Sequence, residues 1–291
     1  MTRMPEQPAG LPGWGQHPAV RRLARAAVAA LHDELALEPK PGLVSRLDSG
    51  SHTDMDAKTF LRSLFALRHS FLRLACLGAA RVSFAELERE GVRAESRMLA
   101  ATEGVNTHRG AIFALGLLCA GAGSLVALCV PMDPAALRRA LMVQWGEALA
   151  TRSTQAGAVG DRSAAWRLGL RGAGAEAALG FPVLFETALP ALQEALAQGL
   201  GPQRARAHAL FAAMAVLDDT NLARRGGLEG LRYAQAAARD WLLGGGAARP
   251  DALEHARALH RDFVARRLSP GGAADVLAAA CWVQRVCAEG P

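Results

Sequence analysis

Apolar residues recur at helical spacing along almost the whole chain. From residue 17 to 37, one helical face carries Val20, Leu23, Ala27, Leu31 and Leu35. Further helices are predicted over 53–80, 83–101, 107–132, 133–150, 203–217 and 250–268, with others ending near 241 and starting near 176 and 269. The pattern predicts an all-α fold, a single large helical domain of about ten helices over residues 1–291. Residues 1–18, rich in Pro and Gly, are expected to be irregular.

The stretch from Ala111 to Met132 contains no charged residue. It is long enough to span a bilayer, but it includes several glycines and no Trp or Tyr flanks it. A helix that is apolar on all sides is also what the middle of a large helical bundle requires. We therefore expect a buried central helix, and no membrane association.

Polar residues at several predicted helix ends have the chemistry of caps. Ser83 and Glu86 form a capping box, Asp133 precedes Pro134, and Thr53 can cap with Asp56 three residues later. Residues 151–174, rich in Gly, Ser, Thr and Arg, are expected to form the longest irregular region. A loop of that length is either a lid or a disordered segment.

Composition narrows the function classes. The chain has 291 residues, is 51% hydrophobic and has few aromatic or β-branched residues, which favours helix over sheet. The 33 basic and 27 acidic residues give a net charge of +6, which fits a protein that handles polyphosphates. No basic run or aromatic-interleaved basic stripe indicates a nucleic-acid partner.

Cysteine usage and the N-terminus indicate a location. The five cysteines form no CxxC motif and lie in apolar helical contexts, which is typical of reduced core residues. The N-terminal segment has no apolar region of the kind a signal peptide needs. A cytoplasmic protein is therefore expected.

Residues 104–110 combine an amide, a hydroxyl, an imidazole and a guanidinium between two glycines, directly before the uncharged stretch. A helix starting near Thr107 would direct its free N–H groups and its positive dipole end toward a ligand, which suits an anion such as phosphate. The alternative is a polar turn before a core helix, with His108 hydrogen-bonded locally. The segment alone does not decide between them.

Two acidic segments provide further chemistry. His52, Asp54 and Asp56 are the kinds of donors that Mg²⁺ or a proton-transfer site would use. In residues 218–227, a continuous helix would place Asp218, Asn221 and Arg225 on one face, whereas a break would free Asp219 for function. Both possibilities remain open. Lys40, in a proline-rich loop, is either a fixed cation or a solvated surface lysine.

The spacing of these segments resembles the triphosphoribosyl-dephospho-CoA synthase family over nearly the whole chain. The resembling stretches are Pro39-Lys40-Pro41-Gly42-Leu43-Val44, Gly50-Ser51-His52-Thr53-Asp54-Met55, Gly104 to Gly110, Asp219-Thr220-Asn221 with Arg225-Gly226-Gly227, and Ser269-Pro270-Gly271-Gly272 to Asp275. Residues 37–40 and 44–50 look like the branch associated with malonate decarboxylase. One position departs from the family pattern: Gly174 stands where an arginine is expected before Glu176, so a phosphate contact there is in doubt unless Arg171 substitutes.

The resemblance implies that ATP transfers its 5-triphosphoribosyl group to the 2′-hydroxyl of 3′-dephospho-CoA and that adenine leaves. The product is the precursor of the prosthetic group of the malonate decarboxylase acyl carrier protein, and a transferase that forms the holo-protein would receive it. Inversion at the ribose carbon implies direct in-line attack. Mg²⁺ is the expected cofactor, and a homodimer is possible.

The resemblance and the side-chain chemistry together give a set of candidate residues. The catalytic candidates are Asp219, Glu176, His108 and His52. The substrate-binding candidates are Lys40, Gly42, Asn106, Thr107, Arg109, Asn221, Arg225, Gly226, Ser269, Gly271 and Gly272. The candidates for holding Mg²⁺ are Asp54, Glu103, Asp218 and Asp219.

Roles within this set follow from charge. Lys40, Arg109 and Arg225 would bind phosphates, Asp219 or Glu176 would be the base, and His52 or His108 would protonate adenine. The alternatives to the synthase are a Mg²⁺-dependent nucleotide N-glycosidase or hydrolase, which would use water as the acceptor, and a non-catalytic nucleotide- or CoA-binding assembly factor.

Overall fold

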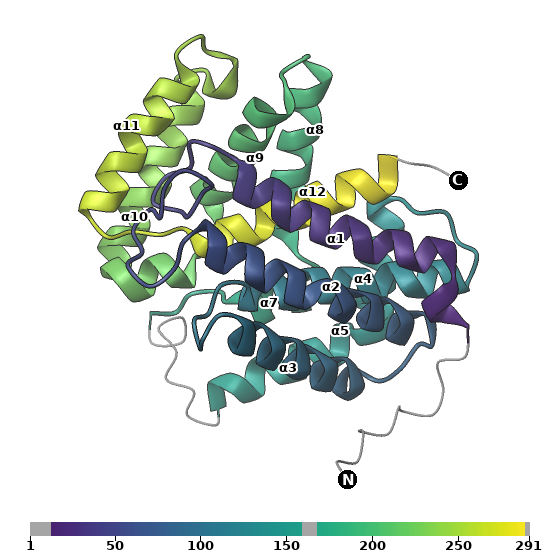
Figure 1. Cartoon of the computed structure of the whole chain (residues 1–291). Coiled ribbons are helices and arrows are strands. Elements are labelled where there is room, and N and C mark those ends of the chain that lie inside the picture. Colours follow the sequence, from purple (N-terminus) through teal and green to yellow (C-terminus); the bar gives the residue numbers. More distant parts are fainter. Residues whose placement is uncertain (1–12, 159–167, 289–291) are drawn as a thin grey trace.

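The computed structural model describes residues 13–158 and 168–288, and within these ranges it contains eleven α-helices and no strand. The predicted all-α fold is confirmed (Figure 1). The α-helices are α1 (Pro18–Ala36), α2 (Ala57–Ala79), α3 (Phe84–Ala101), α4 (Arg109–Ala127), α5 (Pro134–Ala158), α7 (Ala173–Ala178), α8 (Leu189–Ala197), α9 (Pro202–Val216), α10 (Thr220–Leu243), α11 (Ala252–Ala265) and α12 (Gly271–Ala288). Short elements are the 3₁₀ helices η1 (Trp14–Gln16) and η3 (Gly246–Ala248) and the π-helical η2 (Val183–Ala188).

Helix α4 lies at the centre of the fold, as predicted for the uncharged stretch. Helices α1, α2, α5 and α12 all pack against it. It is long and apolar enough to cross a membrane, but 72% of its most apolar window is buried inside the protein. Its apolar surface is therefore covered by neighbouring helices, as a core helix requires.

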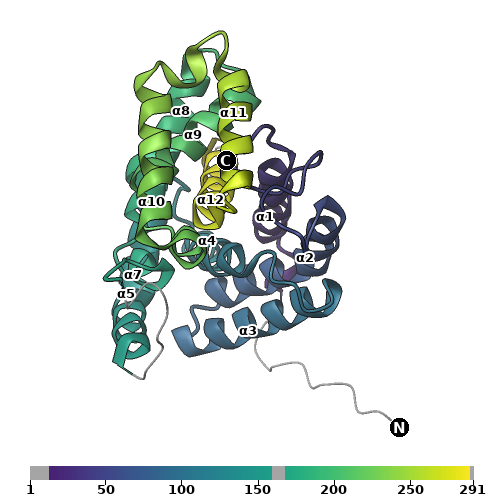
Figure 2. The same cartoon turned by 90° about the vertical axis from the view of Figure 1, so that its left-hand side faces the viewer.

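Helix α12 joins two groups of helices. On one side it contacts α1 and α4, which belong to the group formed by α1 to α5 and α7; on the other it contacts α8 and α9. Helices α8 to α11 form the second group, in which α9 packs against both α8 and α10. Figure 2 shows α12 and α4 between these groups. The segments before α4, α10 and α12 meet at this junction, and they position the site described below.

Local cap chemistry explains several helix starts. Ser83 and Glu86 form the predicted capping box of α3, and Asp133 Oδ1 accepts a hydrogen bond from Ala136 N at 2.8 Å at the start of α5. The expectation that Thr53 caps α2 was wrong. Asp56 is the cap, and it forms a capping box with Thr59. Asp56 can accept backbone N–H bonds as well as Thr53 could, and the sequence pattern did not separate the two.

Parts of the region predicted to be irregular over residues 151–174 are helical. Helix α5 continues to Ala158 and α7 begins at Ala173, while residues 159–167 lie outside the described part of the chain. The Thr154 hydroxyl donates to the carbonyl oxygens of Ala150 at 3.3 Å and Thr151 at 2.8 Å. Back-bonding of this kind satisfies a hydroxyl inside a helix, so a polar composition did not mark a helix end here.

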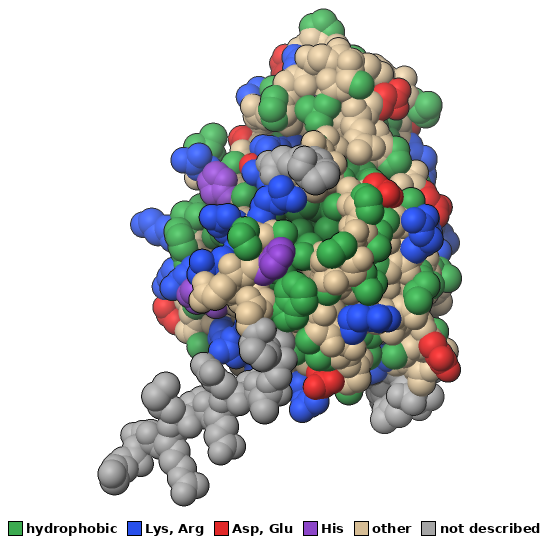
Figure 3. Space-filling model, turned by 90° about the vertical axis from the view of Figure 1, so that its right-hand side faces the viewer, with side chains coloured by type: hydrophobic (Ala, Val, Ile, Leu, Met, Phe, Trp, Pro, Cys, Tyr) green, Lys and Arg blue, Asp and Glu red, His purple; other side chains and the backbone are tan. Residues whose placement is uncertain are grey.

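The surface carries its basic residues in separate groups. On the face shown in Figure 3, Lys and Arg side chains stand among apolar and neutral ones, which agrees with the dispersed charge expected from the sequence. The cysteine prediction holds for Cys76, Cys119 and Cys281, which are buried and unpaired. It was wrong for Cys129, which is exposed because it lies just beyond the end of α4.

Candidate active site

A cavity of about 1170 Å³ lies where the two groups of helices meet. Its wall includes the first residues of α4, α10 and α12, together with parts of α1, α2, α3, α5 and α7. The cavity is large enough for a nucleotide together with a second ligand. Of the predicted site residues, the wall contains His52, Asp54, Asn106, Thr107, His108, Arg109, Asn221, Arg225, Ser269, Gly271 and Gly272.

The segment before α4 forms one side of the cavity. The Asn106 side-chain oxygen accepts a hydrogen bond from Arg109 N at 3.2 Å, and His108 is the residue that immediately precedes the helix. The Thr107 hydroxyl, also on the cavity wall, has no hydrogen-bond partner in the described residues. This side therefore offers an unsatisfied hydroxyl beside the positive end of the central helix.

His108 is buried, and only one of its ring nitrogens has a partner. Nδ1 lies 2.6 Å from the Ser63 hydroxyl, whereas Nε2 is buried without a hydrogen-bond partner among the described residues. The ring also makes an edge contact with Phe60 at 4.9 Å between centroids. Burial, with a smaller effect of Lys40, lowers the pKa of His108 to about 3. The imidazole is therefore neutral near neutral pH and cannot supply the proton that was predicted for it.

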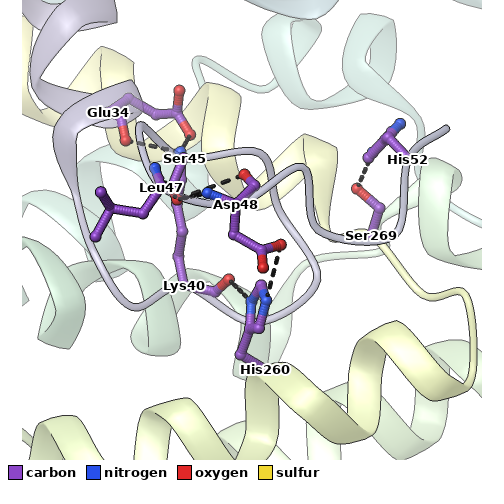
Figure 4. A network of polar contacts seen from close by, with 8 residues as sticks. All are labelled: Glu34, Lys40, Ser45, Leu47, Asp48, His52, His260 and Ser269. Carbon is purple, nitrogen blue, oxygen red and sulfur yellow. Dashed lines mark hydrogen bonds and ion pairs between the residues drawn. The ribbon is translucent and has the colours of Figure 1, made fainter. Parts of the chain in front are cut away.

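His52, Ser269 and Arg225 link two loops to helix α10 on another part of the cavity wall. Arg225 donates through one nitrogen to His52 Nδ1 at 2.9 Å and through the other to the Ser51 carbonyl at 3.0 Å. Because guanidinium only donates, Nδ1 accepts, and His52 Nε2–H then donates to Ser269 Oγ at 2.9 Å (Figure 4). The Ser269 hydroxyl hydrogen therefore remains available to a ligand.

His52 also cannot act as the predicted proton donor to adenine. Burial lowers the pKa of His52, and the charge of Arg225 lowers it further, while Asp54 at 3.6 Å from Nδ1 opposes the shift. The neutral ring accepts a hydrogen bond from Arg225 and donates one to Ser269, and so it holds the Ser269 side chain in position. Its role in this geometry is that of an orienting group.

The position of Asp219 shows whether the helix is continuous through residues 218–227. The helix breaks, and Asp219 is the N-cap of α10, with Oδ1 accepting from Asn221 N at 2.9 Å and Leu222 N at 3.2 Å. Oδ2 accepts from Ala273 N at 3.0 Å, so one carboxylate caps α10 and ties it to α12. Asp219 is buried and absent from the cavity wall. Its predicted roles as base and metal ligand are not supported by this placement, because both oxygens are occupied by backbone donors.

Lys40 is not available to phosphate either. It is 1% exposed, and its ammonium donates to the Glu34 carboxylate and, at 2.8 Å, to the Glu34 carbonyl oxygen. His260 Nδ1–H donates to the Lys40 carbonyl at 2.9 Å, which fixes the loop that carries the lysine (Figure 4). Both the solvated lysine and the predicted phosphate ligand are therefore corrected to a buried ammonium that is paired with Glu34 and does not itself line the cavity.

The four predicted magnesium ligands are not brought together. Only Asp54 lies on the cavity wall; Glu103 pairs with Arg62 at 3.1 Å on the surface, and Asp218 Oδ2 accepts from Arg171 N at 3.0 Å. Within the described residues, no group of three or more His, Cys, Asp or Glu side chains could hold a metal ion. A magnesium ion held jointly by several of the four predicted carboxylates therefore does not fit the described part of the chain.

Glu176 and the two outlying glycines also lie off the cavity wall. Arg171 pairs with Glu176 at 2.6 Å, so an arginine does reach this glutamate although position 174 is glycine. Gly42 has a φ of +65°, and a Cβ there would lie 2.1 Å from the Leu268 carbonyl oxygen. At Gly226 a Cβ would lie 2.5 Å from a Leu268 methyl group. Close packing against Leu268, rather than contact with a ligand, explains both glycines.

The arginines on the cavity wall differ in whether their guanidinium groups are paired with other residues. Arg109 is engaged by Glu95, its Nε donating to Oε1 at 2.6 Å. Arg224, which was not among the predicted residues, is exposed on the wall and makes no hydrogen bond or ion pair to another residue in the described ranges. Its charge is felt by both His52 and Arg225, whose pKa values it lowers. Arg224 is therefore the cation most available to an anionic ligand.

Sequence reasoning also missed Glu34 and Asp275, which both lie on the cavity wall. A signal for Glu34 was present, because it falls three residues after Leu31 on the apolar face of α1. Asp275 closes the last resembling stretch, but its spacing did not distinguish it from a helix-surface aspartate. Only the packing of α12 against α4 shows what this carboxyl touches.

The fold and the cavity define an all-α protein whose site suits a polyphosphorylated nucleotide, with arginine, imidazole and carboxyl side chains together on the cavity wall. The family model for ATP:dephospho-CoA triphosphoribosyl transferase matches residues 20–290, and the chain belongs to this family. It is therefore a transferase that moves the triphosphoribosyl group of ATP to dephospho-CoA. No solved structure matches the chain.

Proposed function

We propose that this transferase joins the ribose C1′ of ATP to the 2′-hydroxyl of 3′-dephospho-CoA, releases adenine, and thereby makes the prosthetic-group precursor of the malonate decarboxylase acyl carrier protein. The assignment to the malonate decarboxylase pathway is supported by the resemblance of residues 37–40 and 44–50 to that branch. The product would then pass to a transferase that forms the holo-acyl-carrier protein. A cytoplasmic location and a homodimer stay predictions.

The observation that carries the proposal is the group formed by Arg224, Arg225, Ser269 and Asn221 on one side of the cavity. It lies where α10 and α12 begin, and the positive ends of these helices are partly offset by Asp219. The remaining charge for a triphosphate comes from the two arginines, and Ser269 adds a hydroxyl donor oriented by His52. This side of the cavity is therefore where we place the triphosphate.

The part of the wall formed by the segment before α4 then receives the base and the acceptor. Direct in-line attack needs the acceptor hydroxyl and the departing adenine on opposite faces of the ribose, and both must be held before reaction. The Thr107 hydroxyl and the side chain of Asn106 are polar groups on this part of the wall. Positive charge that develops on the ribose ring would be stabilised by carboxylates such as Glu34 and Asp54 on the same cavity wall.

Magnesium in this proposal enters with ATP. Mg²⁺ is commonly held by substrate phosphates, several waters and only one or two carboxylates, so it does not require a cluster of ligands such as the one not found among the described residues. Asp54 is the predicted ligand that lies on the cavity wall. When bound, the ion would offset phosphate charge; the transfer itself needs no phosphate cleavage.

The experiment is adenine release from ATP and Mg²⁺ with and without 3′-dephospho-CoA, followed by mass analysis of the CoA species. We expect adenine release that requires the acceptor, and we expect the CoA species to gain the mass of a triphosphoribosyl group. Release without the acceptor would instead show an N-glycosidase, and ATP binding without release would show a non-catalytic binding protein. Loading of the product onto the acyl carrier protein of malonate decarboxylase, compared with that of citrate lyase, tests the branch.

A matched pair of arginine variants tests the placement of the triphosphate. Removing one charge-assisted contact raises the KM for ATP by about 10- to 100-fold, which is the expectation for Arg224→Gln. Arg139→Gln is the control, because Arg139 is exposed on α5 and lies off the cavity wall. Equal KM values for the two variants would refute the placement.

A further inference from the structure

The carboxyl group of Asp275 lies against the start of the central helix. A Cβ at Gly110, the second residue of α4, would stand 1.9 Å from Asp275 Oδ2 and 2.9 Å from its carboxyl carbon. The side chain lies on the cavity wall, as Gly110 and His108 do. The contact joins α12 to the first turn of α4, and it places a carboxyl group next to the part of the cavity wall assigned above to the reacting groups.

The neighbours of Asp275 favour its neutral form. Burial by the surrounding protein raises the pKa of Asp275 well above its ordinary range, and the carboxylates of Glu34 from α1 and Asp219 from the start of α10 raise it further. The Ala111 N–H of α4 acts in the opposite direction. Glu34 itself is paired with the buried ammonium of Lys40. Negative charge close to a buried carboxyl group disfavours its ionised form, so Asp275 holds its proton.

A second observation points to a ligand at the same place. His108 is 3% exposed and lies on the cavity wall, yet its Nε2 has no hydrogen-bond partner among the described residues. A buried polar atom without a partner costs free energy unless a ligand or water satisfies it. The imidazole is neutral, so it can orient a bound group but has no proton to give up.

We propose that Asp275 is the catalytic acid that donates a proton to the adenine leaving group. A neutral carboxyl group offers one O–H donor and one carbonyl acceptor, side by side. The Hoogsteen edge of adenine offers the complement, the N7 acceptor and the N6 amino donor. The same pair of contacts that binds the base therefore places the acidic proton on a ring nitrogen. This inference rests on the proposed function, because it needs adenine to leave.

The C1′–N9 bond breaks, its electron pair passes to the base, and the Asp275 proton moves to a ring nitrogen of adenine. The C1′–O bond forms to the acceptor hydroxyl, whose proton goes to solvent, and the Asp275 carboxylate regains a proton from solvent. The net change is one proton moved from the hydroxyl to adenine. Neither His52 nor His108 could act in this way, because both rings are neutral.

The first test uses the wild-type enzyme and two nucleotides. With ATP, kcat should fall on the alkaline side as Asp275 loses its proton. With 8-aza-ATP, whose base keeps both recognition atoms but departs more readily as an anion, that alkaline fall should be much weaker. Identical profiles for the two nucleotides would overturn the proposal. Absence of adenine release from ATP by the wild type would instead refute the proposed function, and so the two failures are distinguishable.

The second test uses Asp275→Asn, which keeps one donor and one acceptor but cannot transfer a proton. General acid catalysis contributes about 10²- to 10⁴-fold, so kcat with ATP should fall by that factor, with a smaller loss for 8-aza-ATP and ATP affinity largely kept. Asp262→Asn, at an exposed position on α11, is the control and should match the wild type. An equal loss with both nucleotides, or none, would overturn the assignment. If Asp275→Asn does not fold, the wild-type profiles still decide.

Discussion

Gly110→Ala probes the contact between α4 and Asp275 most directly. The new Cβ would meet Asp275 Oδ2 at 1.9 Å, whereas non-bonded carbon and oxygen atoms need at least about 3 Å. The carboxyl group must therefore move by about 1 Å or rotate away. Overpacking of this kind typically costs about 1–3 kcal/mol, and replacing Gly by Ala in a helix returns about 1 kcal/mol. The expected loss of stability is thus about 0–2 kcal/mol.

Activity should fall far more than stability in this variant. A displaced Asp275 no longer reaches adenine, so kcat should drop by about 10²-fold or more. Urea unfolding measures the free energy of unfolding, and adenine release under saturating ATP measures kcat. Gly146→Ala in α5 is the matched control, because its Cβ would meet only the flexible end of Met142, at 3.2 Å. It should keep full activity and gain up to about 1 kcal/mol.

A double variant can refute the reasoning. In an Asp275→Ala background the clashing oxygen is gone, so Gly110→Ala should no longer destabilise the protein and should even stabilise it slightly. A stability loss that persists in that background would mean that the clash with Asp275 is not the cause. Full activity of the single variant would mean that the carboxyl position does not matter for turnover.

Two further predictions concern the buried carboxylates. Asp219→Asn should lower the free energy of unfolding by about 1–3 kcal/mol, because an amide has only one oxygen to accept from the backbone N–H groups of α10 and α12. Turnover should fall together with stability. Thermal unfolding measures the stability, and adenine release measures the turnover. Since burial raises the pKa of Asp219 to about 6, its ionisation weakens the fold as pH rises from about 4 to 6, and that contribution should be missing from the variant. Lys40→Met should lower the free energy of unfolding by about 3–5 kcal/mol, because it leaves Glu34 buried without its cation. Adding Glu34→Gln should recover most of this loss, as measured by urea unfolding. If Lys40 instead bound phosphate, Lys40→Met would raise the KM for ATP.

The sequence determined the helices because their signals are local. The period of apolar residues gave α1 and α4, and the Ser83 capping box and the Asp133–Pro134 pair gave the starts of α3 and α5 within a residue or two. Each of these features depends on residues within one or two turns of each other. The family resemblance likewise needed only the order and spacing of short motifs.

Only the tertiary structure decided what each motif residue touches. Ser269 meets His52 across 217 positions of sequence, and Asp275 meets Gly110 across the junction of α12 and α4. In the sequence, a buried lysine that pairs with Glu34 looks the same as a lysine that binds phosphate. An aspartate that caps two helices likewise looks the same as a catalytic base. Packing settled their roles, because burial and long-range neighbours set both the reach of a side chain and the pKa that its chemistry requires.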